Sequence, residues 1–195
     1  MHKQKIRRMT TLSLLTAVIV VLQLLGYFLP RIGPFGLSFV LIPIVVGAAY
    51  FGPKAGAILG GAFGVIVCIC SYNGIDGGGF MVWQASPFLC ILVVMTKGVL
   101  AGATAGWVYR WLHNKSSSIA TIAASIICPI VNTGIFLLGM FVFFMDVLTV
   151  WADGNSVVAY VLTGIVLINF VPEFIITVVL SPVCRRVIQA VQKNN

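Results

Sequence analysis

The sequence predicts an all-α integral membrane protein, a bundle of six transmembrane helices. Hydrophobic residues make up 60% of the 195 residues and charged residues only 8%, where a soluble domain carries roughly 25% charged residues. The mean hydropathy is +1.10, and apolar runs of membrane-spanning length recur along the whole chain. Because each span takes roughly 20 residues plus a connection, six spans fill residues 1–195 as a single membrane domain.

Charged residues and turn formers separate the predicted spans. In chain order the spans cover 10–29, 37–52, 54–72, 87–111, 118–145 and 157–183. The first span follows a basic leader that resembles a signal peptide, but no A-x-A cleavage site comes after it, so we expect a retained helix. The second span is short and contains Pro43, which a membrane helix tolerates where its neighbours satisfy the freed carbonyl.

Lysine and arginine in the connections predict the orientation. With six crossings, ten basic residues fall on one side of the membrane and Arg31 falls on the other, where Asp76, Asp146 and Asp153 also lie. The ten are Lys3, Lys5, Arg7, Arg8, Lys54, Arg110, Lys115, Arg185, Arg186 and Lys193. Because basic connections remain inside the cell, we expect both termini to be cytoplasmic.

The three outer connections, 30–36, 71–86 and 146–156, are the predicted places of ligand contact, because binding residues concentrate in loops. The stretch 72–79 is rich in glycine. It lacks a G-x-x-x-x-G-K pattern and a following helix start, so it is weak evidence for phosphate binding. Its composition predicts either a mobile lid or a plain connector.

Small residues recur every four positions in the third and fourth spans. The two rows are Gly56, Gly60 and Gly64, and Gly98, Gly102 and Gly106. Four residues are just over one helical turn, so each row forms a groove that lets another helix approach closely. We interpret both rows as packing surfaces within the bundle.

Ionisable residues inside the apolar runs are the first candidates for a functional site. Lys97 lies about 15 Å from the end of the fourth span at 1.5 Å per residue, and Glu173 is similarly deep in the sixth. A charge at such depth is costly, and it marks a functional site by default. The two side chains either form an ion pair that cancels both charges or contact a substrate.

Amides and aromatic residues extend this candidate site. Such side chains hold small polar molecules by hydrogen bonds and stacking, and Lys97 can pair with a substrate carboxylate. The predicted substrate contacts are Tyr72, Trp83, Gln84, Lys97, Asn132, Asn169 and Glu173.

An enzymatic function is not predicted. The two histidines, His2 and His113, lie in the flanks, and one deep carboxylate provides no acid and base pair. No metal or cofactor is expected, because the cysteines form no C-x-x-C pair with histidine partners. The net charge of +8 is scattered between apolar runs, so nucleic acid is not an expected partner.

Several segments together resemble an S component, the substrate-binding membrane subunit of an energy-coupling factor (ECF) vitamin transporter, over nearly the whole chain. They are the basic leader Lys5–Arg8, Ser13-x-x-x-Ala17, Ile42-Pro43, Tyr50–Ala57, the helix from Lys97-Gly98 to Gly106, and Pro129–Gly134. The resemblance implies a vitamin bound on the outer side and carried inward, in a prokaryotic plasma membrane.

The resemblance also implies partners. In that family a small-xxx-small motif of the first helix packs on a transmembrane T component, which two cytoplasmic ATPases drive. Ser13 and Ala17 would be the docking positions here, with Ser13 in place of the usual alanine. Lys97 favours an anionic vitamin such as pantothenate over riboflavin, while folate and a cobalamin precursor stay open.

Two other functions remain as alternatives. A membrane scaffold without a small-molecule substrate would have less reason to bury Lys97, Asn132 and Asn169. An autonomous secondary transporter, coupled to protons through Glu173, would usually show internal repeats, and the two halves show no convincing similarity.

Overall fold

The computed structural model describes residues 2–28 and 39–193, and the side chains of 6–27 and 39–188. All regular structure in these two ranges is helical. The helices are α1 (His2–Phe28), α2 (Leu41–Phe51), α3 (Pro53–Tyr72), α4 (Gly77–Ala85), α5 (Pro87–His113), α6 (Ser117–Phe143), α7 (Met145–Ala152), α8 (Val157–Tyr160), the π-helical η1 (Val161–Phe170), α9 (Val171–Val179) and α10 (Ser181–Lys193). The predicted connection 30–36, with Arg31, lies outside the described residues, as do the last residue of the first predicted span and the start of the second.

Five helices of the described chain are long and apolar enough to cross a membrane. They are Ile6–Tyr27, Pro53–Tyr72, Pro87–His113, Ser117–Phe143 and Val157–Val179, the last built from α8, η1 and α9. The shorter apolar helix α2 accompanies them. These helices confirm the prediction of an all-helical membrane protein.

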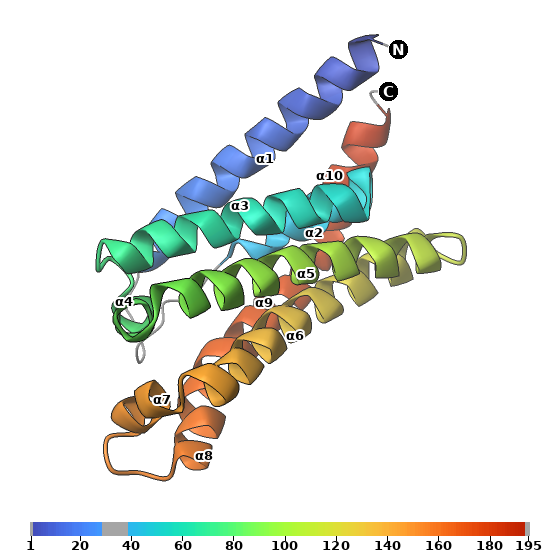
Figure 1. The fold of residues 1–195 in the computed structure, drawn as a ribbon. Coiled ribbons are helices and arrows are strands. Elements are labelled where there is room, and N and C mark those ends of the chain that lie inside the picture. The colour runs from blue at the N-terminus through green and yellow to red at the C-terminus, as the bar shows by residue number, and fades with distance from the viewer. Residues whose placement is uncertain (1, 29–38, 194–195) are drawn as a thin grey trace.

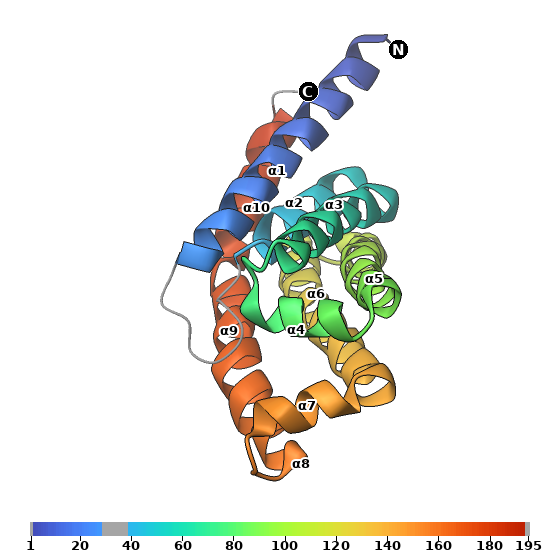
Figure 2. The same cartoon turned by 60° about the vertical axis from the view of Figure 1, so that its left-hand side comes forward.

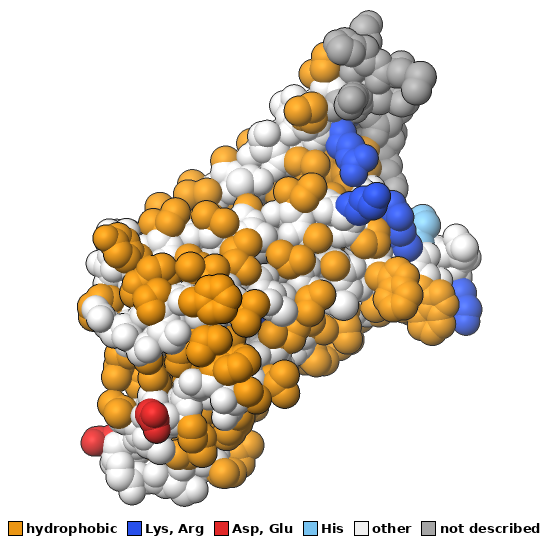
Figure 3. Space-filling view, in the orientation of Figure 1, with side chains coloured by type: hydrophobic (Ala, Val, Ile, Leu, Met, Phe, Trp, Pro, Cys, Tyr) orange, Lys and Arg blue, Asp and Glu red, His pale blue; other side chains and the backbone are white. Residues whose placement is uncertain are grey.

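The helix termini and the connections between helices lie at two opposite ends of the molecule. The N- and C-terminal ends, the α2–α3 junction and the α5–α6 turn gather at one end, and α4, α7 and α8 lie at the other (Figures 1 and 2). Basic side chains cluster at the first end and acidic ones at the second, with an apolar belt between them (Figure 3). The charges thus flank a surface suited to lipid.

The two glycine rows pack against each other and bring α3 and α5 into backbone contact. A Cβ atom at Gly60 would overlap the carbonyl oxygen of Gly98, and one at Gly56 would overlap that of Gly102. Gly106 faces Pro53 in the same way, with only 2.7 Å between a Cβ and the Pro53 Cα. The rows are therefore packing surfaces within the bundle, as the sequence predicted. The structure adds that each row is the groove into which the other helix fits.

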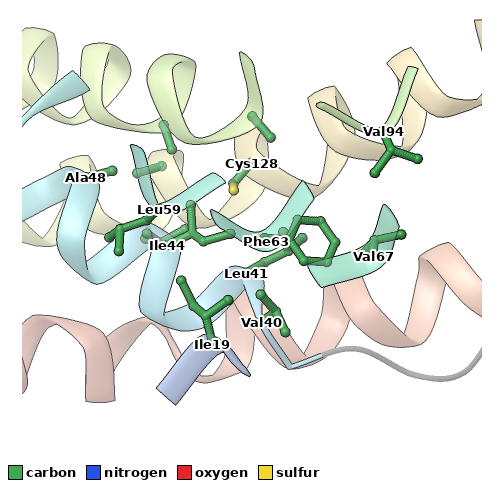
Figure 4. Packing of buried hydrophobic residues seen from close by; sticks show 14 of the residues in the cluster. Ile19, Val40, Leu41, Ile44, Ala48, Leu59, Phe63, Val67, Val94 and Cys128 are labelled. Carbon is green, nitrogen blue, oxygen red and sulfur yellow. The ribbon is translucent and has the colours of Figure 1, made fainter. Parts of the chain in front are cut away.

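A core of aliphatic and small residues fills the space among α1, α2, α3, α5 and α6 (Figure 4). Ile19 of α1, Ile44 of α2 and Leu59 of α3 are completely buried there. Gly52 joins α2 to α3 with a φ of +91°, a conformation that favours glycine. Pro53 then starts α3, where its missing N–H leaves no helical bond unmade.

The glycine-rich stretch contains a helix start, contrary to the sequence prediction. α4 begins at Gly77, and the carboxylate of Asp76 accepts a hydrogen bond of 3.2 Å from the backbone N–H of Gly79. This side-chain cap satisfies one of the open N–H groups of the first turn. The stretch is therefore half turn and half helix, not a plain connector.

Candidate functional site

Lys97 lies in the middle of α5, one residue before the glycine row that contacts α3. Its ammonium nitrogen is 4.8 Å from the ring centroid of Phe136 on α6 and 5.7 Å from that of Phe63 on α3. At these distances the negative ring faces attract the cation. Two aromatic rings from neighbouring helices therefore hold the charge inside the bundle.

Lys97 lines a cavity of about 80 Å³, which has room for several water-sized groups. Five of the long apolar helices meet at this cavity. α1, α3, α5, α6 and the η1–α9 segment all contribute side chains. The lining residues are Gln23, Tyr27, Phe63, Val67, Asp76, Lys97, Asn132, Thr133, Phe136, Ile165, Asn169 and Glu173. Three ionisable side chains, three aromatic rings, amides and hydroxyls thus share one enclosure.

Part of the cavity lining is polar. Asn132 and Glu173 are each only 6% exposed, and the Oδ1 atom of Asn132 is buried without a hydrogen-bond partner. A buried acceptor of this kind costs about 1–3 kcal/mol when left unpaired. An N–H or O–H of a bound molecule would remove that cost, so the atom favours a ligand that donates hydrogen bonds.

An irregular helix carries Asn169 and Glu173. The wide π-helical turns of η1 end at Phe170, two residues before Pro172, which has no N–H to donate to the preceding turn. Segments of π-helix are frequent at functional sites. Four-residue spacing brings Asn169 and Glu173 to the same side, and both line the cavity.

Lys97 and Glu173 share the cavity without forming a direct ion pair in the described part of the chain. The Lys97 charge rests instead against the two aromatic rings. A second carboxylate, that of Asp76, also lines the cavity. The lysine is therefore placed to receive an anionic group from a ligand.

Several lining residues were not identified from the sequence. Asp76 was counted as a connection acid, yet it is 8% exposed and lies 3.5 Å from the hydroxyl of Tyr27, which donates to it. The pair of Gln23 and Tyr27, four residues apart on α1, was a possible signal. The aromatic and aliphatic members, Phe63 and Phe136 among them, gave none, because such residues are common throughout the spans.

The remaining predicted contacts lie outside the cavity lining. Tyr72 at the end of α3 is 63% exposed, and its ring packs edge-on against that of Trp83, with centroids 5.6 Å apart. Gln84 on α4 is exposed. These three residues form a neighbouring surface at the acidic end of the molecule.

The predicted docking residues Ser13 and Ala17 are both exposed on α1. Because they are four positions apart, they lie on one side of the helix. Among the side chains described, those of residues 6–27 and 39–188, no three histidine, cysteine or acidic groups lie together where they could hold a metal ion.

Comparison with known proteins gives two matches. A family model described as "ECF transporter, substrate-specific component" matches residues 7–184. The pantothenic acid transporter PanT of Lactococcus lactis subsp. cremoris is 26% identical over 192 residues, which cover 93% of this chain and 93% of that protein. The family match includes every residue that lines the cavity.

Proposed function

Because the chain belongs to the family of ECF transporter substrate-specific components, we propose that it binds pantothenate in the cavity and serves as the substrate-binding subunit of an ATP-driven importer. Membership in the family confirms the resemblance seen in the sequence. It also makes the chain a transporter component, not an enzyme.

One observation carries the choice of substrate: a lysine held by two aromatic rings in a cavity that also contains an unpaired amide oxygen. Pantothenate has one carboxylate, two hydroxyls and an amide N–H. Its carboxylate would pair with Lys97, and one of its donors would satisfy Oδ1 of Asn132. Its methyl groups would pack on Phe63 and Phe136. The name of the relative from Lactococcus lactis supports the same substrate.

The membrane topology is proposed to include α2 as a sixth crossing. At 1.5 Å per residue its 11 residues extend about 16 Å, roughly half of a bilayer core. The position of both termini at one end favours an even number of crossings (Figure 1). The basic side chains at that end favour cytoplasmic termini (Figure 3), with substrate entering from the acidic end.

Partners follow from the same proposal. The transport cycle would use a transmembrane T component and two cytoplasmic ATPases. The exposed, small side chains of Ser13 and Ala17 suit close helix packing, so we propose this side of α1 as the docking surface.

The proposed substrate site is tested by titrating the purified chain with pantothenate and with panthenol, in which an alcohol replaces the carboxylate. We expect wild-type protein to prefer pantothenate by roughly 30-fold or more, the order expected for a buried charge pair. Lys97→Gln should abolish most of this preference and leave panthenol binding little changed. Lys115→Gln removes an exposed charge outside the cavity and is the matched control.

The four affinities, of wild-type protein and Lys97→Gln for pantothenate and panthenol, form a thermodynamic cycle. This cycle isolates the interaction energy between Lys97 and the carboxylate. A wild-type preference that persists in Lys97→Gln would contradict the assigned role of the lysine. Failure of pantothenate to bind, with tight binding of riboflavin, folate or a cobalamin precursor, would contradict the proposed substrate.

A further inference from the structure

A second hollow lies outside the cavity lined by Lys97. It is at the basic end of the molecule, where the last turns of α5 pass the start of α3. This groove has a volume of about 770 Å³. Its lining residues are Pro53, Trp107, Val108, Arg110, Trp111 and Asn114. Positions 107, 110, 111 and 114 follow helical spacing, so one side of α5 forms most of the groove.

Two tryptophans make the groove apolar and open. Trp107 is 72% exposed and Trp111 is 77% exposed, and neither side chain makes a hydrogen bond to a described residue. Tryptophan concentrates where a membrane meets water, because its ring is apolar and its N–H needs a polar partner. The groove therefore lies at the edge of the apolar belt.

Arg110 adds a cation to the lining of the groove. Its guanidinium lies against the α2–α3 junction, so close that a Cβ at Gly52 would overlap it. No described residue pairs with this guanidinium. Lys54, next to Pro53 in α3, is also exposed. The acidic side chains shown in Figure 3 lie at the opposite end of the molecule, so the groove is positively charged.

We infer that this groove binds an anionic phospholipid. Its phosphate would accept two hydrogen bonds from the Arg110 guanidinium, a geometry that arginine provides and lysine does not. The glycerol and the first methylenes would lie between Trp107 and Trp111, and the acyl chains would continue along the exposed apolar surface. Basic pockets between membrane helices recognise anionic headgroups in this way. Charge complementarity selects an anionic lipid over a zwitterionic one.

Native mass spectrometry of the full chain in detergent, with added phosphatidylglycerol or phosphatidylcholine, tests the inference. We expect the first phosphatidylglycerol to bind wild-type protein more tightly than phosphatidylcholine. Arg110→Gln should weaken phosphatidylglycerol about fivefold, the effect of one basic residue at a membrane surface, and leave phosphatidylcholine unchanged. Arg110→Lys, which keeps the charge but not the paired hydrogen bonds, should give a smaller loss.

Arg186→Gln is the matched control, because it removes an exposed charge from α10 without altering the groove. Equal losses in Arg110→Gln and Arg186→Gln would overturn the site, since they would indicate diffuse attraction alone. Equal binding of the two lipids to wild-type protein would also overturn it. A photocrosslinking residue at Trp107 in native membranes should label phospholipid, and labelling of a protein instead would make the groove a protein contact and refute the inference.

Discussion

The α3–α5 interface and the wall of the cavity formed by α6, η1 and α9 are built in opposite ways. At the interface, glycines such as Gly60 and Gly98 bring two regular helices into backbone contact. In the wall, Asn132 of α6 and Glu173 of α9 are buried polar residues, and the π-helical η1 makes the helix that leads into α9 irregular. Close packing fixes the position of a helix, whereas the irregular wall supplies polar groups. Lys97, adjacent to Gly98, lies where the two regions meet.

The largest effect is expected where the backbones touch. Gly60→Leu would force a side chain into the carbonyl of Gly98, which α5 can relieve only by moving away. Overpacking of this kind costs typically 1–3 kcal/mol and more against rigid backbone, so we expect a loss of about 3 kcal/mol or more. The measurement is thermal unfolding of the purified chain in detergent.

Gly134 of α6 is the matched control, because a Cβ there would meet no atom within 4 Å. Gly134→Leu should remain within about 0.5 kcal/mol of wild type, or slightly above it, since leucine favours helix. Equal losses of stability in Gly60→Leu and Gly134→Leu would contradict the prediction that close α3–α5 packing requires glycine at position 60.

Substitutions in the cavity wall should change ligand affinity more than they change the stability of the protein. Asn132→Leu removes the unpaired Oδ1 atom and keeps a side chain of similar size. We expect pantothenate binding to weaken about tenfold, the value of roughly one hydrogen bond. The melting temperature without ligand should stay constant or rise, because a buried polar atom without a partner is lost. A lower melting temperature with unchanged affinity would assign Asn132 a structural role.

The sequence was most informative where a residue contrasts with its surroundings. Lys97, Asn132, Asn169 and Glu173 were identifiable because charged and amide groups are costly in an apolar run, and the structure brings all four to one cavity. Phe63 and Phe136 give no contrast, since cation–π contacts depend on how helices face one another. The glycine rows predicted close packing, but their spacing alone did not indicate that each row was the partner of the other.

Local helix starts were harder to predict. The stretch 72–79 has the composition of a loop, and only the spacing of Asp76 and Gly79 matches an N-terminal cap. The π-helical turns of η1 had no identifiable signal except Pro172, because apolar residues form α- and π-helix with the same side chains. Tertiary packing decides such cases.

A smaller effect is expected at the α4 cap, on the border of the cavity. Asp76→Ala removes the acceptor for the Gly79 N–H and should destabilise the chain by about 1 kcal/mol. Asp76→Asn keeps a capping oxygen and should stay within a few tenths of a kcal/mol of wild type. Chemical or thermal unfolding of both variants distinguishes the contribution of the capping hydrogen bond to stability from that of the carboxylate charge. An equal loss in Asp76→Asn would show that the carboxylate charge matters, for example through Tyr27.

The smallest effect is expected at Tyr72, outside the cavity lining. Its ring contacts Trp83 on the surface and is mostly exposed, so Tyr72→Ala should change pantothenate affinity by less than about twofold, the range of surface substitutions. Titration beside Asn132→Leu makes the comparison direct, because both variants remove a side chain predicted from the sequence to contact substrate. A tenfold loss in Tyr72→Ala would extend the binding site from the cavity to the α3–α4 surface.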